Sequence, residues 1–242
     1  MSQTIRNAHG ERLDFTLHDA DGDTLVLIGH GVTGNKDRDW ALLLAECLSA
    51  AGIAALRFSF AGNGDSEGTF EASCPSKEAS DLEAVLDFAE GLDKPRLLYA
   101  GHSMGAVAGV LVAAGDGRLA GLISLAGMVH TEDFYERKFG AQAPGANLMW
   151  DKPECPLSCV FVDDMRKIGS VLPLASAIFV PWLLIHGTED TVVPLVESEQ
   201  AAALGRSAIL AILADADHVF SGEHGPKMAA LVTEWARLLP PP

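Results

Sequence analysis

The chain of 242 residues fits a single α/β domain, spanning residues 1–242, with at most a small insert. Hydrophobic residues make up 48% of it and charged residues 21%, so a sizeable core can form and wholesale disorder is excluded. Lys and Arg number 17 against 33 Asp and Glu, and the resulting net charge of −16 disfavours nucleic acid and anionic membranes as partners.

The N-terminal segment MSQTIRNAHGERLD lacks the apolar core of a secretory signal, and we expect a cytoplasmic protein. Residues 4–7 and 13–18 are predicted strands that pair as a hairpin through His9-Gly10. The later strands are nearly continuous apolar runs, which is typical of strands buried on both faces of a parallel sheet. They are predicted over residues 24–28, 53–58, 96–100, 119–126, 180–186 and 208–213.

Helical patterns lie between these strands and complete an alternating order. They are predicted over residues 40–51, 80–90, 103–114, 195–204 and 226–239. Such alternation indicates an α/β fold with a doubly wound, mostly parallel sheet of eight strands and right-handed crossovers.

Two uncharged stretches, residues 97–115 and 171–188, are long enough to be examined as membrane spans. The first contains His102, Ser103 and four glycines, and the second contains two prolines and His186. Buried strands, turns and helices explain both stretches better, so we expect a soluble protein without a membrane partner.

Residues 128–176 interrupt the alternation with four prolines and a mixture of aromatic and charged residues. We expect a small cap insertion over the carboxyl edge of the sheet, where open α/β folds bind ligands. Its apolar residues could line a substrate pocket or only pack the insert onto the core, and both interpretations stay open. They are Phe134, Tyr135, Phe139, Leu148, Met149 and Trp150.

The chain has four cysteines, too few for a disulfide scaffold. Cys155 and Cys159 are four residues apart and could pair or bind a metal. No second pair with zinc-ligand spacing accompanies them, so we expect unpaired thiols and no metal site.

The motif that indicates chemistry most strongly is Gly101-His102-Ser103-Met104-Gly105, a G-x-S-x-G sequence between a predicted strand and a predicted helix. A nucleophile on so sharp a turn needs neighbours with almost no side chain, which Gly101 and Gly105 provide. The motif therefore predicts Ser103 as a nucleophile, against the alternative of an ordinary strand-to-helix turn.

A serine nucleophile needs a base that is oriented by a carboxylate, in the chain order Ser, Asp or Glu, His. Asp190 follows the predicted strand 180–186, and His218 follows the predicted strand 208–213. Both therefore lie at the sheet edge that carries Ser103. Glu189 and Asp217 are adjacent competitors whose side chains we expect to point elsewhere.

An acyl-transfer site also needs two hydrogen-bond donors for the developing oxyanion. The backbone N–H of Met104, directly after the nucleophile, is one candidate. The N–H of Val32, in the loop after the predicted strand 24–28, is the other. His30 in that loop is expected to be a structural, hydrogen-bonded histidine.

Two glycine-rich loops offer a nucleotide-binding alternative. Residues 29–34 match G-x-G-x-x-G, but the next predicted strand ends without the acidic residue that would hold a ribose. Residues 62–68 lack the Gly-Lys-Ser/Thr of a phosphate loop. We expect the second loop to be a tight turn beside the active site, although Asp65 could contact substrate.

Taken together, these motifs resemble the α/β-hydrolase superfamily over nearly the whole chain. Within it, the sequence is similar to small cinnamoyl and feruloyl esterases and to serine-aminopeptidase-like hydrolases. The resemblance implies hydrolysis of a small-molecule carboxylic ester by a Ser103-Asp190-His218 triad, without a cofactor, in a monomer or homodimer. This sequence departs from the family pattern at two positions. The family usually has Asp or Asn where Ser59 stands, and a basic residue or Asn where Ala61 stands.

Two alternatives remain at this point. The same triad could act on amide, peptide or thioester bonds, or serve an acyltransferase or perhydrolase. A non-catalytic ligand-binding protein with this fold would usually have lost a member of the triad, and here none is missing.

Overall fold

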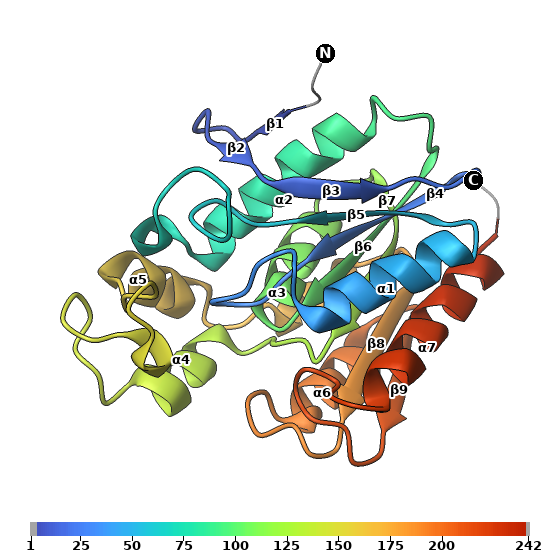
Figure 1. Ribbon diagram of the computed structural model, residues 1–242. Coiled ribbons are helices and arrows are strands. Elements are labelled where there is room, and N and C mark those ends of the chain that lie inside the picture. Colours follow the sequence, from blue (N-terminus) through green and yellow to red (C-terminus); the bar gives the residue numbers. More distant parts are fainter. Residues whose placement is uncertain (1–3, 241–242) are drawn as a thin grey trace.

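The computed structural model describes residues 4–240, with a seven-stranded sheet at its centre and helices on both faces (Figure 1). The strand order is β3-β5-β4-β6-β7-β8-β9, and only β3 runs antiparallel to its neighbour. The strands are β3 (Phe15–His18), β4 (Thr24–Gly29), β5 (Ala54–Phe58), β6 (Arg96–His102), β7 (Leu119–Leu125), β8 (Trp182–Gly187) and β9 (Ala208–Leu213). The doubly wound, mostly parallel α/β fold predicted from the sequence is confirmed.

The predicted count of eight strands in this sheet is wrong for the described residues. The predicted strand 13–18 divides at Asp14 into β2 (Arg12–Leu13) and β3, and β2 pairs with β1 (Ile5–Arg6) in a separate hairpin. The pairing changes from β1 to β5 at Asp14, because the Asp14 N–H donates to Ser66 Oγ and its carbonyl accepts from the Ser59 N–H. The chain thus leaves the hairpin at Asp14 and joins β5.

The helices cover the two faces of the sheet unequally. α1 (Asp39–Ala50) and α7 (His224–Leu238) pack together on one face, while α2 (Pro75–Ala89), α3 (Met104–Ala113) and α6 (Leu195–Leu204) lie on the other (Figure 1). α2 begins five residues before its predicted start, because Pro75 occupies the first turn, where a missing N–H costs no helical hydrogen bond.

The segment between β7 and β8 carries helices of its own and, within the described residues, no strand of the sheet. It contains α4 (Thr131–Phe139), α5 (Cys159–Ile168) and two 3-10 helices (Met149–Asp151 and Leu172–Ala177); a third 3-10 helix (Phe70–Ala72) lies before α2. α4 and α5 lie beside each other at one end of the sheet (Figure 1). Among residues 4–240, none of the helices combines the length and the apolar character that crossing a membrane requires.

Candidate active site

Ser103 lies at the turn between β6 and α3, in a backbone conformation that is rare for a side-chain-bearing residue (φ 53°, ψ −117°). A Cβ on Gly101 would overlap the backbone of Gly105, and a Cβ on Gly105 would overlap the carbonyl of His30. The prediction that these glycines remove clashes around the turn is therefore confirmed. The turn is tied to the sheet by the Ser103 N–H, which donates to the Leu125 carbonyl at 3.0 Å.

Asp190 and His218 follow β8 and β9, and the structure brings their side chains together. His218 Nδ1 lies 2.7 Å from Asp190 Oδ2, so Nδ1–H donates to the carboxylate and Nε2 is left to face the pocket. Asp190 Oδ1 accepts from the N–H groups of Val192 and Val193, at 2.8 and 2.9 Å. The Asp190 side chain is only 1% exposed. Water around the carboxylate is replaced by four protein donors, namely His218, the two backbone N–H groups and His186.

The fourth donor of Asp190 is His186, which the sequence analysis did not single out. His186 Nε2 lies 3.2 Å from Asp190 Oδ2 and 3.0 Å from the Val193 carbonyl, while Nδ1 accepts from the Ser198 hydroxyl at 2.7 Å. Burial by itself raises the pKa of Asp190, but the hydrogen bonds from His186 and His218 hold that pKa well below its usual range. Asp190 is therefore a carboxylate whenever the protein is folded at neutral pH.

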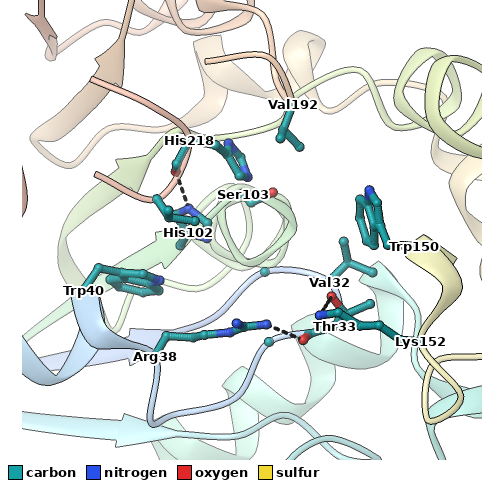
Figure 2. A pocket seen from close by; sticks show the side chains of 13 residues that line it. Val32, Thr33, Arg38, Trp40, His102, Ser103, Trp150, Lys152, Val192 and His218 are labelled. Atoms are coloured by element: carbon teal, nitrogen blue, oxygen red, sulfur yellow. Dashed lines mark hydrogen bonds between the residues drawn. The ribbon is translucent and has the colours of Figure 1, made fainter. Parts of the chain in front are cut away.

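Ser103 and His218 line the same pocket, and Figure 2 shows the His218 ring beside the Ser103 side chain. Within residues 4–240 the Ser103 hydroxyl makes no hydrogen bond in this conformation. Hydrogen bonds between a nucleophile and its base are often long without substrate and tighten in the reacting complex. The side chains of Ser103 and His218 both lie at the pocket wall.

His102 fixes the loop that carries His218. Its Nε2–H donates to the His218 carbonyl at 2.8 Å, and its ring lies between those of Trp40 and His218, with centroids 4.9 and 4.7 Å away. Burial, and then the charge of His218, lowers the pKa of His102 to about 3, so the ring is neutral. The variable position of the G-x-S-x-G motif gave no sequence signal for this role.

His30 has the structural role that the sequence predicts. Its ring is buried, with Nδ1 2.8 Å from the Gly31 carbonyl, and Nε2 accepts the Phe60 N–H at 3.1 Å. Burial lowers the pKa of His30 to about 4. A neutral ring with these two bonds links the loop after β4 to the turn after β5.

The N–H groups of Val32 and Met104 have no acceptor within the described residues. Met104 opens α3, where the first N–H groups of a helix lack intrahelical partners. The loop that carries Val32 lies against Ser103, since a Cβ on Gly31 would come within 2.8 Å of Ser103 Cβ. Two unpaired donors therefore belong to segments that adjoin Ser103, one to the first residue of α3 and one to the loop after β4.

The pocket at Ser103 has a volume of about 180 Å³ and draws its walls from the loop after β4, the insert and the loops after β8 and β9. From the insert, only Trp150 and Lys152 line it (Figure 2). Phe134, Tyr135 and Phe139 are buried, so these aromatic residues pack the insert onto the core. The lining residues are Gly31, Val32, Thr33, Gly34, Arg38, Trp40, His102, Ser103, Trp150, Lys152, Val192, His218 and Val219.

The turn over residues 62–68 supports the site from outside the pocket. The Ser66 hydroxyl donates to the Ser59 carbonyl at 2.7 Å, and the Asp65 carbonyl accepts from Arg12 at 2.8 Å. Asp65 does not line the pocket. The interpretation of this segment as a packed turn is therefore favoured over a substrate contact by Asp65.

All four cysteines lie in the described part of the chain and are free thiols, as expected. Cys155 is buried, which raises the pKa of its thiol, and Cys159 is exposed. Within residues 4–240, no three His, Cys, Asp or Glu side chains are grouped as metal ligands.

The sequence of the chain is similar to that of known proteins. The sequence model of the alpha/beta hydrolase family matches residues 25–231. Uncharacterized protein YfhR of Salmonella typhi is 30% identical over 216 residues, which are 82% of this chain and 66% of that protein. YfhR of Escherichia coli strain K12 is 27% identical over 207 residues, 83% of this chain and 65% of its own length. The chain thus spans just under two thirds of these relatives.

Two solved structures show the same fold. Est1E from Butyrivibrio proteoclasticus, with ferulic acid bound, has a TM-score of 0.83 and 22% identity, covering 98% of this chain and 99% of that one. Mouse alpha/beta hydrolase domain-containing protein 10 has a TM-score of 0.81 and 16% identity, with the same coverage. At these identities the likeness concerns the fold.

Proposed function

Because the chain belongs to the alpha/beta hydrolase family, we propose that it is a serine hydrolase that cleaves carboxylic esters through an acyl-enzyme intermediate. The observation that carries the proposal is the pair of Asp190 and His218, joined at 2.7 Å, beside a strained Ser103 at the wall of a pocket. A nucleophile, a base and an orienting carboxylate are the three groups that acyl transfer needs.

In the first half of the proposed reaction, Ser103 Oγ attacks the ester carbonyl carbon while His218 Nε2 takes the hydroxyl proton. The carbonyl oxygen becomes an oxyanion, which accepts hydrogen bonds from the N–H groups of Val32 and Met104. When the tetrahedral intermediate collapses, the C–O bond to the alcohol breaks and His218 returns the proton to the leaving oxygen. An acyl-Ser103 ester and the free alcohol result.

In the second half, water repeats the attack on the acyl-Ser103 ester. His218 Nε2 takes the proton of the water as its oxygen bonds to the acyl carbon, and the same two N–H groups hold the new oxyanion. Collapse releases the carboxylic acid and returns the proton to Ser103 Oγ. Asp190 stays ionised throughout, because its role is to orient His218 and stabilise the imidazolium.

The pocket favours small substrates. A volume of about 180 Å³ accommodates a short acyl chain or a single ring more readily than a long chain. Trp40 and Trp150 offer aromatic surface there, so an aromatic acid such as the one bound by Est1E belongs in the test panel.

The test is a set of initial hydrolysis rates over esters from acetate to octanoate together with methyl ferulate. We expect hydrolysis of the smaller esters by the wild type and a fall of about 10⁴-fold or more in Ser103→Ala, because removing a member of a triad leaves only residual catalysis. Ser207, an exposed serine without a side-chain hydrogen bond within the described residues, provides the matched control Ser207→Ala, which should retain full activity.

Near-normal turnover by Ser103→Ala would overturn the assignment of the nucleophile. Folded wild-type protein that hydrolyses no ester would overturn the proposal of ester hydrolysis, and the same panel with thioesters and amides would then show whether the triad acts on those bonds.

A further inference from the structure

The charge of the pocket contrasts with the charge of the chain. The protein has a net charge of −16, yet none of the thirteen residues that line the pocket is Asp or Glu. Two of them, Arg38 and Lys152, are permanent cations at neutral pH. The pocket wall is therefore positively charged in a protein whose net charge is strongly negative.

Arg38 comes from the loop before α1, and its side chain is held by a backbone carbonyl, with no carboxylate of the described residues to neutralise its charge. Its Nη2 donates to the Thr33 carbonyl at 2.7 Å. The neighbouring Asp37 carboxylate is bound by Lys36 and Arg57 instead, at 2.8 and 2.7 Å. Arg38 forms no salt bridge within the described residues, so donors of its guanidinium remain free for a ligand.

Lys152 comes from the insert, at the tip of a tightly built loop. Leu148 and Pro156 pair as an isolated β-bridge, and the Met149 N–H donates to the Cys155 carbonyl at 2.8 Å. The buried side chains of Met149 and Cys155 anchor the base of this loop. Its tip turns through two residues with positive φ, Trp150 (48°) and Asp151 (56°), neither of which is glycine.

Strained residues of this kind persist only where the surrounding structure imposes them, and they cluster at functional sites. Here the strain places Trp150 and Lys152 against the pocket, while Asp151 lies outside the lining. Lys152 Nζ contacts Thr33 Oγ1 at 3.4 Å and forms no salt bridge within the part of the chain that the structure describes.

The two cations converge on Thr33 from opposite sides of the pocket, facing Ser103 and His218 across it (Figure 2). We propose that Arg38 and Lys152 form a recognition site for a carboxylate on the substrate, so that the preferred esters carry a negative charge on their acyl or alcohol part. This inference rests on the proposed ester hydrolysis at Ser103. The insert thereby contributes specificity through one cation and one aromatic side chain.

A carboxylate fits these partners chemically. The planar guanidinium of Arg38 matches the two oxygens of a carboxylate, and the ammonium of Lys152 adds a point charge from the other side. The charge of the carboxylate they bind does not change during ester cleavage, so they bind the ground state and the transition state about equally. Their loss should therefore raise KM and leave kcat nearly unchanged.

The test compares two pairs of esters of matched shape. Monomethyl glutarate is paired with methyl 5-methylhexanoate for a charge on the acyl part, and carboxymethyl acetate is paired with isobutyl acetate for a charge on the alcohol part. For at least one pair, the wild type should prefer the anion by about tenfold or more in kcat/KM, which equals about 1.4 kcal/mol. The pair that shows the preference identifies the side of the ester that faces the cations.

The variants Lys152→Gln and Arg38→Gln should each reduce this preference by about threefold or more through KM, with activity on the neutral esters retained. Lys167→Gln is the matched control, because Lys167 is an exposed lysine of the same insert that does not line the pocket. It should leave the preference unchanged. The wild type offers a test without mutation, since raising ionic strength from about 0.05 M to about 0.5 M should weaken the preference by screening.

Equal kcat/KM values for anionic and neutral esters in the wild type would overturn the proposal. So would a preference that survives in the Arg38→Gln, Lys152→Gln double variant, or a loss of kcat on charged and neutral esters alike, which would place the cations at the oxyanion. If the wild type hydrolyses neither these four esters nor any ester of the first panel, the ester hydrolysis itself fails, and that result is distinct from a loss of charge preference. Hydrolysis of the first panel without hydrolysis of either anionic ester would overturn the charge preference alone.

Discussion

Asp190 is the residue on which most of the site depends. Its two oxygens accept from His186, His218 and two backbone N–H groups in an almost water-free position. A buried carboxylate with four donors is stable in the ionised form and fixed in direction. His218 is therefore held with Nδ1 toward Asp190 and with Nε2 free, which is the tautomer that a general base for Ser103 requires.

We expect His186→Leu to lower kcat by about tenfold with little change in KM, because Asp190 loses one of its donors and orients His218 less firmly. His186 acts through Asp190 and is a positioning residue. The conservative variant His186→Gln, whose amide can still donate, should recover part of the loss. Steady-state kinetics on one ester measures both, and wild-type kcat in His186→Leu would contradict the role.

Met104 separates catalytic from structural effects at a single residue. Its N–H is the proposed oxyanion donor, and its side chain is fully buried in the core. We expect Met104→Ala to keep kcat, because the N–H is retained, but to lower the free energy of unfolding by about 2–5 kcal/mol through the cavity it leaves. Urea unfolding and kinetics on the folded variant test this, and a large loss of kcat with unchanged stability would contradict it.

The arrangement of helices and loops at the site depends on how closely α3 approaches the loop after β4. Gly105 sits where any Cβ would overlap the His30 carbonyl, so the first turn of α3 can lie against that loop only with glycine there. The same approach sets Ser103 beside the loop that carries Val32. The insert adds Trp150 and Lys152 to the pocket wall, and Lys152 contacts Thr33 of the loop after β4.

Gly105→Ala should therefore disrupt the site and lower the free energy of unfolding by about 1–3 kcal/mol or more, since backbone has to move to admit the methyl group. Gly115→Ala is the matched control, because a Cβ there meets nothing within 4 Å. Thermal unfolding and ester hydrolysis compare the two variants. A Gly105→Ala protein as stable and active as Gly115→Ala would contradict the role given to this close approach.

At the scale of the whole molecule, a buried acidic pair makes folding sensitive to pH. Glu78 in α2 is 1% exposed, and its Oε2 has no hydrogen-bond partner. Burial, and then the neighbouring Asp81, raises the pKa of Glu78 well above its usual range. The folded protein therefore keeps Glu78 protonated at a pH at which the unfolded chain ionises it, and stability falls as pH rises above the unfolded pKa.

Replacing Glu78 by Gln should remove this dependence. We expect Glu78→Gln to be more stable than the wild type at about pH 8, with the difference shrinking toward about pH 4.5, at up to about 1.4 kcal/mol per pH unit. Glu83→Gln, an exposed change on the same helix, serves as control. Urea unfolding across this range measures the difference, and parallel stability curves for Glu78→Gln and the wild type would contradict the prediction.

The predictable part of this protein follows from local rules. The alternation of apolar strands with helical patterns defines the fold, and the G-x-S-x-G spacing defines the turn at Ser103, because both are visible in a short stretch of sequence. Lys152 escaped prediction because its contact with Thr33 joins segments that are far apart in the sequence. His186 and Arg38 contact residues only four and five positions away, but the loop conformations that bring these residues together have no repeating sequence pattern. The predicted number of strands was wrong because of Asp14. This residue forms hydrogen bonds with Ser59 and with Ser66, which is 52 residues away, and these bonds decide where the hairpin ends and β3 begins.

The proposed activation of Ser103 by His218 and Asp190 can be tested chemically, without knowledge of the substrate. The folded protein is treated with a fluorophosphonate, and the labelled residue is identified by mass spectrometry of its peptides. We predict one label per chain, on Ser103, and much slower labelling in His218→Ala. A label on another residue, or none on folded protein with an accessible pocket, would contradict the claim.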